Sequence, residues 1–458
     1  MARRHVVVVG GGITGLSAAY ELRRAADPPD VTVLEASDRL GGKILTTPFA
    51  GLPAVDAGPD SVLARVPWAV QLLRDLDLET ELVAPATGAA SVWWRGHLHP
   101  IPSGLVLGVP TGLPALARSR LLSWPGKARA AMEPLLPRTD GDDDLGLTIR
   151  RRFGAEVYDR LVGPLVASIN AADPRRISLA ATAPQVAEAA ARHRSLLLGL
   201  RANRPTGASG PIFLTHARGL GHVVHRLAIA LRDDGVALRV AQPAGVVAFD
   251  GERYRVGGLA ADGVVLAVPA DAAAEALDEV APAAAPRLRT IRYASVAMVT
   301  LALPVRAVGR PLDGSGYLVP AAEQRHVTAC SWASSKWAHL AGSGQVVLRA
   351  SVGRDGQERT LELDDDGLVA ATVADLRIHL RLRSDPTAVR VTRWPRSFPQ
   401  YEPGHLDRVA AIEGALPTGI VVAGASYRGI GIASCVRQGR EAARATIARW
   451  VEPAKLSG

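Results

Sequence analysis

The chain opens on the stretch His5-Val6-Val7-Val8-Val9-Gly10-Gly11-Gly12-Ile13-Thr14-Gly15, and this stretch decides the fold. The β-branched run before Gly10 is typical of a buried parallel strand. The glycines at 10, 12 and 15 fit the spacing G-x-G-x-x-G. In that motif one glycine makes a tight turn, one lets a phosphate approach the backbone, and one lets a helix pack closely on the strand. A helix is expected from there to about residue 26, with its N-terminus toward the phosphates.

An acidic residue completes the pattern of a dinucleotide-binding unit. A second strand is expected over 31–34, and it ends in Glu35. A carboxylate at that place can accept hydrogen bonds from both ribose hydroxyls. A lone glycine motif is a weak signal. Strand, glycines, helix, strand and glutamate in this order predict a Rossmann-type nucleotide site.

Matching elements recur in the middle and at the far end of the chain. Residues 420–425 predict a strand that ends in glycine, and a helix is expected from about Ser434 to Trp450. A helix near 221–232 and strands near 237–241, 253–256 and 264–269 form the middle group. The sequence therefore predicts an α/β fold whose Rossmann-like domain is assembled from N-terminal, middle and C-terminal segments, namely residues 1–80, 206–275 and 396–458.

The two remaining parts of the chain lack Rossmann signals. Residues 81–205 are expected to be mostly helical, with helices over 145–167 and 182–200. Residues 276–395 are expected to combine strands, at 294–303 and 346–352, with one helix over 368–383. We expect these two insertions to form a discontinuous α+β domain that holds the substrate.

Composition narrows the class of protein. The chain has 458 residues and a net charge of +9, and all but four of its 53 basic residues are arginine. The arginines are dispersed, and no zinc-finger or RNA-binding pattern occurs, so no nucleic-acid partner is expected. An anionic substrate or a membrane surface fits the charge equally well. Two distant cysteines exclude a disulfide scaffold and favour a reducing, cytoplasmic compartment. No apolar run is long enough to span a membrane.

Three features offer alternative interpretations. The acidic runs at 140–144 and 364–366 precede predicted helices, so we expect N-caps rather than metal ligands. His222 and His225 have no glutamate nearby and no third ligand, so we expect them on a helix surface or in the core, and no metal site is predicted. Residues 103–137 are rich in leucine and proline. Together with Arg118, Arg120, Lys127 and Arg129 they predict either a surface that rests on a bilayer or an ordinary helical hairpin.

Several longer stretches carry a resemblance to known proteins. Arg39-Leu40-Gly41-Gly42-Lys43 resembles the R-x-G-G-R stretch of the glutathione-reductase-like flavoproteins, with Lys43 in place of the second arginine. With six further stretches, the chain resembles the protoporphyrinogen/coproporphyrinogen oxidase family nearly end to end, and its bacterial coproporphyrinogen III oxidases in particular. The six stretches cover residues 56–61, 97–102, 164–174, 316–320, 349–353 and 399–405.

The resemblance implies a glutathione-reductase-like FAD domain and non-covalent FAD, because Cys435 lies outside the pattern of the covalent amine oxidases. It implies FAD contacts at Gly10, Gly11, Gly12, Ile13, Thr14, Gly15, Glu35, Ala36, Arg39, Gly42, Lys43, Gly58, Pro59, Asp60, Ser61, Ala244, Ala425, Ile430, Gly431 and Ile432. It implies a substrate pocket at Asn170, Leu318, Ser351 and Phe398, although many members have Gly-Ile-Tyr where Ser168-Ile169-Asn170 stands. Asp60, which matches the bacterial form, is either a catalytic proton relay or a turn residue.

The implied activity is the oxidation of a porphyrinogen. Six electrons leave the substrate, so a two-electron flavin turns over three times and dioxygen becomes hydrogen peroxide each time. The substrate propionates are expected to pair with arginines, of which the candidates are Arg65, Arg95, Arg175 and Arg354. The alternatives are oxidation of protoporphyrinogen IX, a flavin amine oxidase and a non-catalytic flavin scaffold. The expected partners are the porphyrinogen, dioxygen, a downstream haem-pathway enzyme and the cytoplasmic membrane face through a peripheral contact.

Overall fold

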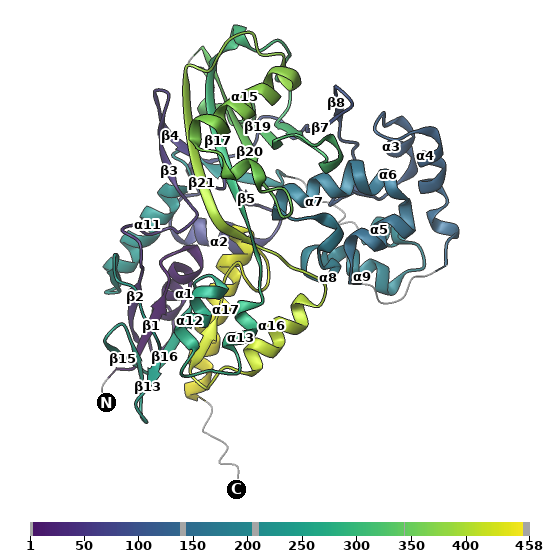
Figure 1. Ribbon diagram of the computed structural model, residues 1–458. Helices are drawn as coiled ribbons and strands as arrows, with labels where there is room; N and C mark the ends of the chain where they lie inside the picture. Colours follow the sequence, from purple (N-terminus) through teal and green to yellow (C-terminus); the bar gives the residue numbers. More distant parts are fainter. Residues whose placement is uncertain (1–2, 138–142, 204–209, 343, 452–458) are drawn as a thin grey trace.

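A computed structural model of the protein describes residues 3–137, 143–203, 210–342 and 344–451 (Figure 1). Its central layer is a five-stranded parallel sheet in the order β12-β2-β1-β16-β22. The strands come from three distant parts of the chain, so the predicted α/β fold is confirmed. They are β1 (His5–Val9), β2 (Asp30–Leu34), β12 (Ala237–Arg239), β16 (Gly263–Leu266) and β22 (Ile420–Val422).

Helices cover both faces of this sheet, which explains why β1 is apolar throughout. Val6 and Val8 pack with one group of helices, whereas Val7 and Val9 pack on the opposite face. The first group is α1 (Ile13–Arg23), α2 (Pro67–Asp75), α11 (Leu220–Asp233) and α17 (Ile432–Val451). The second group is α12 (Ala270–Leu277), α13 (Ala285–Arg289) and α16 (His405–Gly414), together with β13 (Ala248–Phe249), β14 (Tyr254–Val256) and β15 (Leu259–Ala261).

A seven-stranded sheet forms the second layer, drawn at the top of Figure 1. Helix α15 (Asp365–Leu380) packs on one of its faces through Leu368, Leu376 and Leu380. Strands from both insertions meet here, because β18 pairs in parallel with β7. The strands, in spatial order, are β21 (Ala388–Pro399), β17 (Tyr293–Pro304), β20 (Gln345–Val352), β19 (Val327–Trp332), β18 (Gly316–Leu318), β7 (Ser91–Trp94) and β8 (His97–Pro100).

A lobe of short helices stands beside this sheet (Figure 1). The two long helices predicted over 145–167 and 182–200 are wrong in length. Gly154 has a φ of +91° and ends α5. The second stretch is divided at residues 193–195, where His193 is extended after α9 and Ser195 caps α10 by accepting from Leu198 N. The helices are α3 (Leu113–Arg118), α4 (Trp124–Ala131), α5 (Leu145–Phe153), α6 (Ala155–Val157), α7 (Gly163–Asn170), α8 (Leu179–Thr182), α9 (Pro184–Arg192) and α10 (Leu196–Ala202).

The acidic residues before two helices act as N-caps, as predicted. Asp144 accepts a hydrogen bond from Leu147 N at the start of α5, and Asp364 accepts one from Gly367 N at the start of α15. Residues 140–142 of the first acidic run lie outside the described residues. Within the described ranges, no helix is both long and apolar enough to cross a membrane.

Candidate active site

Two helix N-termini meet at the carboxyl edge of the parallel sheet. Helix α1 follows β1, and α17 follows β22. A Cβ atom added to Gly424, after β22, would lie 3.6 Å from Thr14 Oγ1, so the two loops adjoin. Strand β2 lies on one side of β1 and strand β16 on the other, so the strand order changes direction at β1. Open α/β sheets bind ligands at such a topological switch point.

The glycines of the first loop have the separate roles that the motif predicts. Gly10 has a φ of +105°, a backbone conformation that favours glycine. A Cβ on Gly15 would lie 1.9 Å from the Gly10 carbonyl oxygen, so only glycine permits this packing of helix on strand. Glycine is therefore required at position 10 by the backbone conformation and at position 15 by the close contact.

Open space lies in front of both helix starts. A Cβ on Gly12 or on Gly431 would meet no heavy atom within 4 Å. Gly12 is also the N-cap of α1, and no side chain caps the N–H groups of that helix. Backbone donors that face open space at a positive helix end suit a phosphate group. The residues present therefore fit a dinucleotide cofactor with its diphosphate at the Gly10–Gly15 loop.

Glu35 lies beside the glycine loop, as the sequence predicts. Its carboxylate accepts hydrogen bonds from Gly11 N at 2.7 Å and from Ser37 N and Oγ at 2.9 and 2.7 Å. Ala36 is exposed on the same edge. The segment that contains Ala244 runs alongside, because Gln242 N donates to Glu35 O at 2.9 Å. Glu35, Ala36 and Ala244 thus share one edge of the site.

The basic stretch after Glu35 folds back on the glycine loop. Gly41 N donates to Gly11 O at 2.8 Å. The Arg39 guanidinium donates to Gly42 O at 2.5 Å and to Ile44 O at 3.1 Å, so it shapes its own turn. Lys43 Nζ donates to Ser397 O at 2.5 Å, and loss of hydration lowers the pKa of this ammonium group. Both side chains bind backbone carbonyls here rather than extend toward a diphosphate.

Asp60 lies in a network of charges. Its carboxylate contacts Lys336 Nζ at 3.1 Å and Arg349 Nη1 at 2.9 Å, and it accepts a hydrogen bond from Trp337 Nε1 at 3.1 Å. Burial alone would raise the pKa of Asp60, but Lys336 and Arg349 outweigh that effect and hold the pKa well below its usual range. Such a carboxylate is a weak base, so the structure argues against Asp60 as a proton relay.

The sequence analysis missed the partners of Asp60. Lys336 and Trp337 follow β19 and lie far from Asp60 in the chain, so no local pattern indicates them. Arg349 could have been predicted as a site residue, because it lies two residues before Ser351 and alternate residues of a strand share a face. Arg349 also donates to Gly58 O. The segment of Gly58, Pro59, Asp60 and Ser61 is therefore attached to the face of the large sheet that carries Ser351.

The predicted substrate residues gather around that face. Leu318 and Ser351 lie in one row across the sheet, both opposite Ala329 of β19. Met298 extends the row on β17, and all four residues are partly exposed. These side chains lie on the face opposite α15, because the alternate residues pack with that helix.

Asn170 and Phe398 lie next to one another at the end of α7. Gln400 Nε2 contacts the backbone oxygens of both, at 3.4 and 2.9 Å. The Asn170 amide donates to Val166 O, so it points into its own helix. Asp355 N donates to Ala171 O at 2.8 Å and joins this corner to the end of β20, just past Ser351. The four predicted residues thus surround one region.

The four candidate arginines have different environments. Arg65, Arg95 and Arg175 are exposed, and Arg175 pairs with Asp173. Arg354 is 3% exposed and donates to Gln357 Oε1 and Val319 O, yet its Nη2 has no hydrogen-bond partner within the described part of the chain. Burial lowers the pKa of Arg354 to about 10, so it stays charged at neutral pH. Arg354 is therefore a buried candidate with an unused guanidinium donor.

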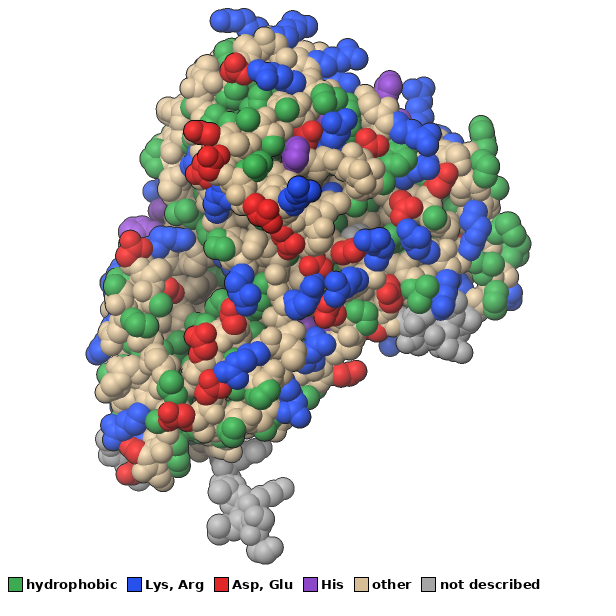
Figure 2. Space-filling view, viewed as in Figure 1, with side chains coloured by type: hydrophobic (Ala, Val, Ile, Leu, Met, Phe, Trp, Pro, Cys, Tyr) green, Lys and Arg blue, Asp and Glu red, His purple; other side chains and the backbone are tan. Residues whose placement is uncertain are grey.

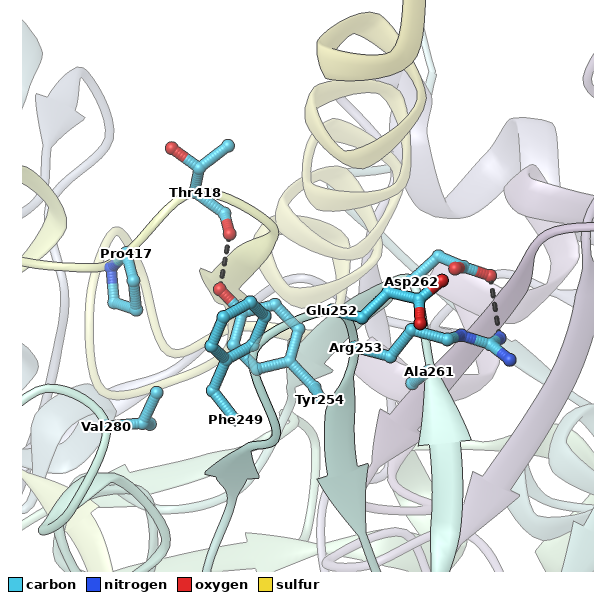
Figure 3. A pocket seen from close by; sticks show the side chains of 9 residues that line it. All are labelled: Phe249, Glu252, Arg253, Tyr254, Ala261, Asp262, Val280, Pro417 and Thr418. Carbon is cyan, nitrogen blue, oxygen red and sulfur yellow. Dashed lines mark hydrogen bonds and ion pairs between the residues drawn. The ribbon is translucent and has the colours of Figure 1, made fainter.

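Two features lie away from this site. A cleft of about 610 Å³ opens at the amino edge of the parallel sheet, between Phe249, Tyr254 and Pro417 (Figure 3).

The expectation that His222 has no glutamate nearby is wrong. Its ring lies 4.8 Å from that of His216, whose Nε2 is 3.9 Å from Glu81. No group of three or more His, Cys, Asp or Glu residues in the described ranges could hold a metal ion.

Comparisons with known proteins agree with this geometry. The family described as flavin containing amine oxidoreductase matches residues 13–447. The fold and the site define a flavin oxidoreductase, and the chain belongs to this family. It is 37% identical to the coproporphyrinogen III oxidase of Bacillus subtilis (strain 168), over 96% of this chain and 97% of the relative. It is 30% identical to that of Staphylococcus aureus, over 97% and 99% of the two chains.

A solved structure supports the same grouping. A crystal structure from Exiguobacterium sp. 255-15, provisionally assigned as a protoporphyrinogen oxidase, matches with a TM-score of 0.86 and 32% identity, over 99% of this chain and 100% of that one. The resemblance to the protoporphyrinogen/coproporphyrinogen oxidases is thus confirmed, and with it a flavin cofactor.

Asp56, just before the Asp60 segment, gives the site a pH-dependent element. It is 8% exposed and accepts hydrogen bonds from Thr46 Oγ1 and from Leu220 N at the start of α11. Burial raises the pKa of this carboxyl from 3.8 to about 6, although Thr46 and Arg349 act in the opposite direction.

The variant Asp56→Asn should flatten the pH dependence of stability. Because folding raises this pKa, the protonated carboxyl favours the folded state at low pH, and that stability is lost as the pH rises from about 4 to about 6. The variant should be more stable than the parent at pH 7 by up to about 3 kcal/mol. Thermal unfolding from pH 4 to pH 8 measures the effect. The exposed control Asp407→Asn should keep the parent profile, and an equal slope in both variants would contradict the assignment.

Proposed function

We propose that the protein oxidises coproporphyrinogen III to coproporphyrin III in haem biosynthesis, with FAD as the flavin and dioxygen as the electron acceptor. The carrying observation is the 37% identity, over 96% of the chain, to a coproporphyrinogen III oxidase. The substrate loses six hydrogen atoms, and three dioxygen molecules become three hydrogen peroxide molecules. Bound FAD would supply the two-electron oxidation.

The arrangement of the site supports FAD rather than a smaller flavin. Glu35 would accept from the ribose of the adenosine half, at the edge that Ala36 and Ala244 share. The Gly10–Gly15 loop would hold the diphosphate. The loop from Ala425 to Ile432, at the start of α17, would lie at the flavin ring. FAD has both the adenosine half that Glu35 would bind and the flavin ring that would lie at the start of α17.

The chain's own residues orient the substrate and need no strong base. The partly exposed row of Leu318, Ser351 and Met298 offers a largely apolar wall to a tetrapyrrole. Arg354 would pair with a propionate, because a buried guanidinium with an unused donor favours a carboxylate. Asp60 would hold Lys336 and Arg349 in place while water accepts the protons.

Oxidation of protoporphyrinogen IX is the second candidate, favoured by the Exiguobacterium structure. Its substrate has two vinyl groups where coproporphyrinogen has two further propionates. The chain's net charge of +9 favours the more acidic substrate. An amine substrate is less suited, because aromatic residues make up 4% of the chain and an aromatic cage is therefore not indicated.

The purified protein should be yellow and should release FAD when precipitated by acid. The variant Glu35→Ala should bind FAD more weakly by about 1–3 kcal/mol, because it loses a charged hydrogen-bond acceptor for ribose. Titration of the apoprotein with FAD measures this, and the exposed neighbour Asp38→Asn is the control. Recovery of a nicotinamide nucleotide, or of a flavin that stays covalently attached, would contradict the proposal.

Coproporphyrinogen III should be oxidised with close to three hydrogen peroxide molecules per porphyrin formed. The measurement compares initial rates on coproporphyrinogen III and protoporphyrinogen IX and counts peroxide in the same assay. A preference for protoporphyrinogen of more than about tenfold, equal to about 1.4 kcal/mol in the transition state, would establish the second candidate instead.

We further propose a cytoplasmic protein that contacts the membrane face peripherally, where a downstream haem-pathway enzyme would receive the product. Trp124 is 79% exposed, Leu135 73% and Met132 51%, all on or just after α4. Basic and hydrophobic side chains lie along this outer edge of the helical lobe (Figure 2). Arg118 and Arg120 are exposed nearby, and Lys127 Nζ lies 4.7 Å from the Trp124 ring centre.

Any membrane-bound fraction should be released by high salt, because exposed charge contacts are screened and a single basic–apolar patch anchors weakly. The variant Trp124→Ser should lower vesicle binding, whereas Trp450→Ser, on the opposite domain, should not. Cell fractionation and sedimentation with anionic vesicles measure the two effects. Protein that only detergent can extract would show the attachment to be of another kind.

A further inference from the structure

One buried hydroxyl closes the loop between β22 and α17. Tyr401 is 3% exposed and lies just past the end of β21. Its hydroxyl donates to Ala425 O at 2.6 Å and accepts from Gly429 N at 2.9 Å. These two groups stand at opposite ends of the loop from Ala425 to Gly429. A hydroxyl can join them because it donates and accepts at the same atom.

The Tyr401 ring is itself held in place. It stacks on the His405 ring, with centroids 4.1 Å apart and an angle of 19° between the planes. Burial lowers the pKa of His405 to about 4, so the ring is neutral, and its Nε2 donates to Tyr427 O at 2.8 Å. Ser178 N donates to Tyr401 O at 2.6 Å and ties the residue to the helical lobe.

The far side of the loop is held by α17. Gln438 Nε2 donates to Gly429 O at 3.2 Å, and Gln438 Oε1 accepts from Arg428 N at 3.1 Å. Gly429 is thus fixed through both its N–H and its carbonyl group. The open space in front of Gly431 lies two residues further on. Tyr401 and Gln438 together fix the position of the backbone of residues 425–431, which we call the cradle of the proposed flavin ring.

We infer that Tyr401 is a positioning residue for the flavin, and this inference rests on the proposed function. By closing the loop it fixes the start of α17 relative to the cofactor. Donors held in advance stabilise negative charge better than donors that must reorganise. A fixed helix N-terminus favours the anion that reduction creates on the flavin more than it favours the neutral oxidised ring.

The chain offers a matched control at the other end of the same strand. Tyr254 is 7% exposed, and its hydroxyl donates to Thr418 O, just before β22 (Figure 3). Each tyrosine therefore holds a backbone carbonyl beside β22. Tyr254 does so at the amino edge of the sheet, away from the cradle, so Tyr254→Phe removes a similar contact without touching the proposed flavin site.

The test compares the wild-type protein with Tyr401→Phe and Tyr254→Phe. Both variants should lower the melting temperature of the apoprotein. Only Tyr401→Phe should weaken FAD binding, by about tenfold, as expected when two buried backbone groups lose their partner. Only Tyr401→Phe should also lower the reduction potential of the bound flavin. A further tenfold loss of affinity for the reduced form corresponds to about 30 mV for a two-electron couple.

Equal FAD affinity and potential in the wild type and Tyr401→Phe would overturn the inference, as would equal losses in both variants. If Tyr401→Phe does not fold, His405→Leu replaces it, because it removes the stacked ring and leaves the hydroxyl free to move. The same shifts, smaller in size, are then expected, and their absence overturns the inference. A wild-type apoprotein that binds no FAD would overturn the proposed function, and this inference with it.

Discussion

Helices α1 and α17 come from opposite ends of the chain and pack with their backbones in contact. A Cβ on Gly439 of α17 would lie 2.3 Å from the Thr14 carbonyl oxygen of α1. This approach holds α17 against the first turn of α1, and open space faces both Gly12, before α1, and Gly431, before α17. A larger side chain at position 439 would force the helices apart and would separate the glycine loop before α1 from the loop before α17. The cofactor site therefore depends on a contact between residues more than 400 positions apart.

A single segment, residues 397–405, connects the three parts of the molecule. Ser397 accepts from Lys43 near the glycine loop, and Tyr401 binds the loop before α17. Gln400 contacts Asn170 of the helical lobe, while Gly404 N donates to Asp143. Through this segment, the proposed substrate region and the proposed cofactor site are fixed relative to one another. This explains why a stretch without titratable catalytic groups figured in the family resemblance.

The sequence predicted the parts of the fold that depend on local patterns. The apolar run of β1, the glycine spacing and Glu35 each carry their signal within about 30 residues, and the nucleotide site follows from them. The breaks at Gly154 and at residues 193–195 interrupt helices whose apolar pattern continues across them, so periodicity alone overestimated their length. The charge state of Asp60 could not be predicted in this way, because it is set by Lys336 and Arg349, which come from distant parts of the chain. The proximity of Glu81 to His216 and His222 could not be predicted either, because these residues are also far apart in the sequence.

Asp60 and Arg354 are both buried charges, but their surroundings differ in a way that bears on specificity. Asp60 has two cations and a tryptophan N–H, so its charge is compensated within the protein. Arg354 has two neutral acceptors and an unpartnered Nη2 within the described residues, and the attraction of Asp173 only partly offsets its burial, so its charge is incompletely compensated. An incompletely compensated buried charge destabilises a folded protein. A carboxylate that reaches Arg354 would relieve this cost on binding, which a vinyl group at the same position cannot do. Arg354 thus favours a substrate that carries propionates.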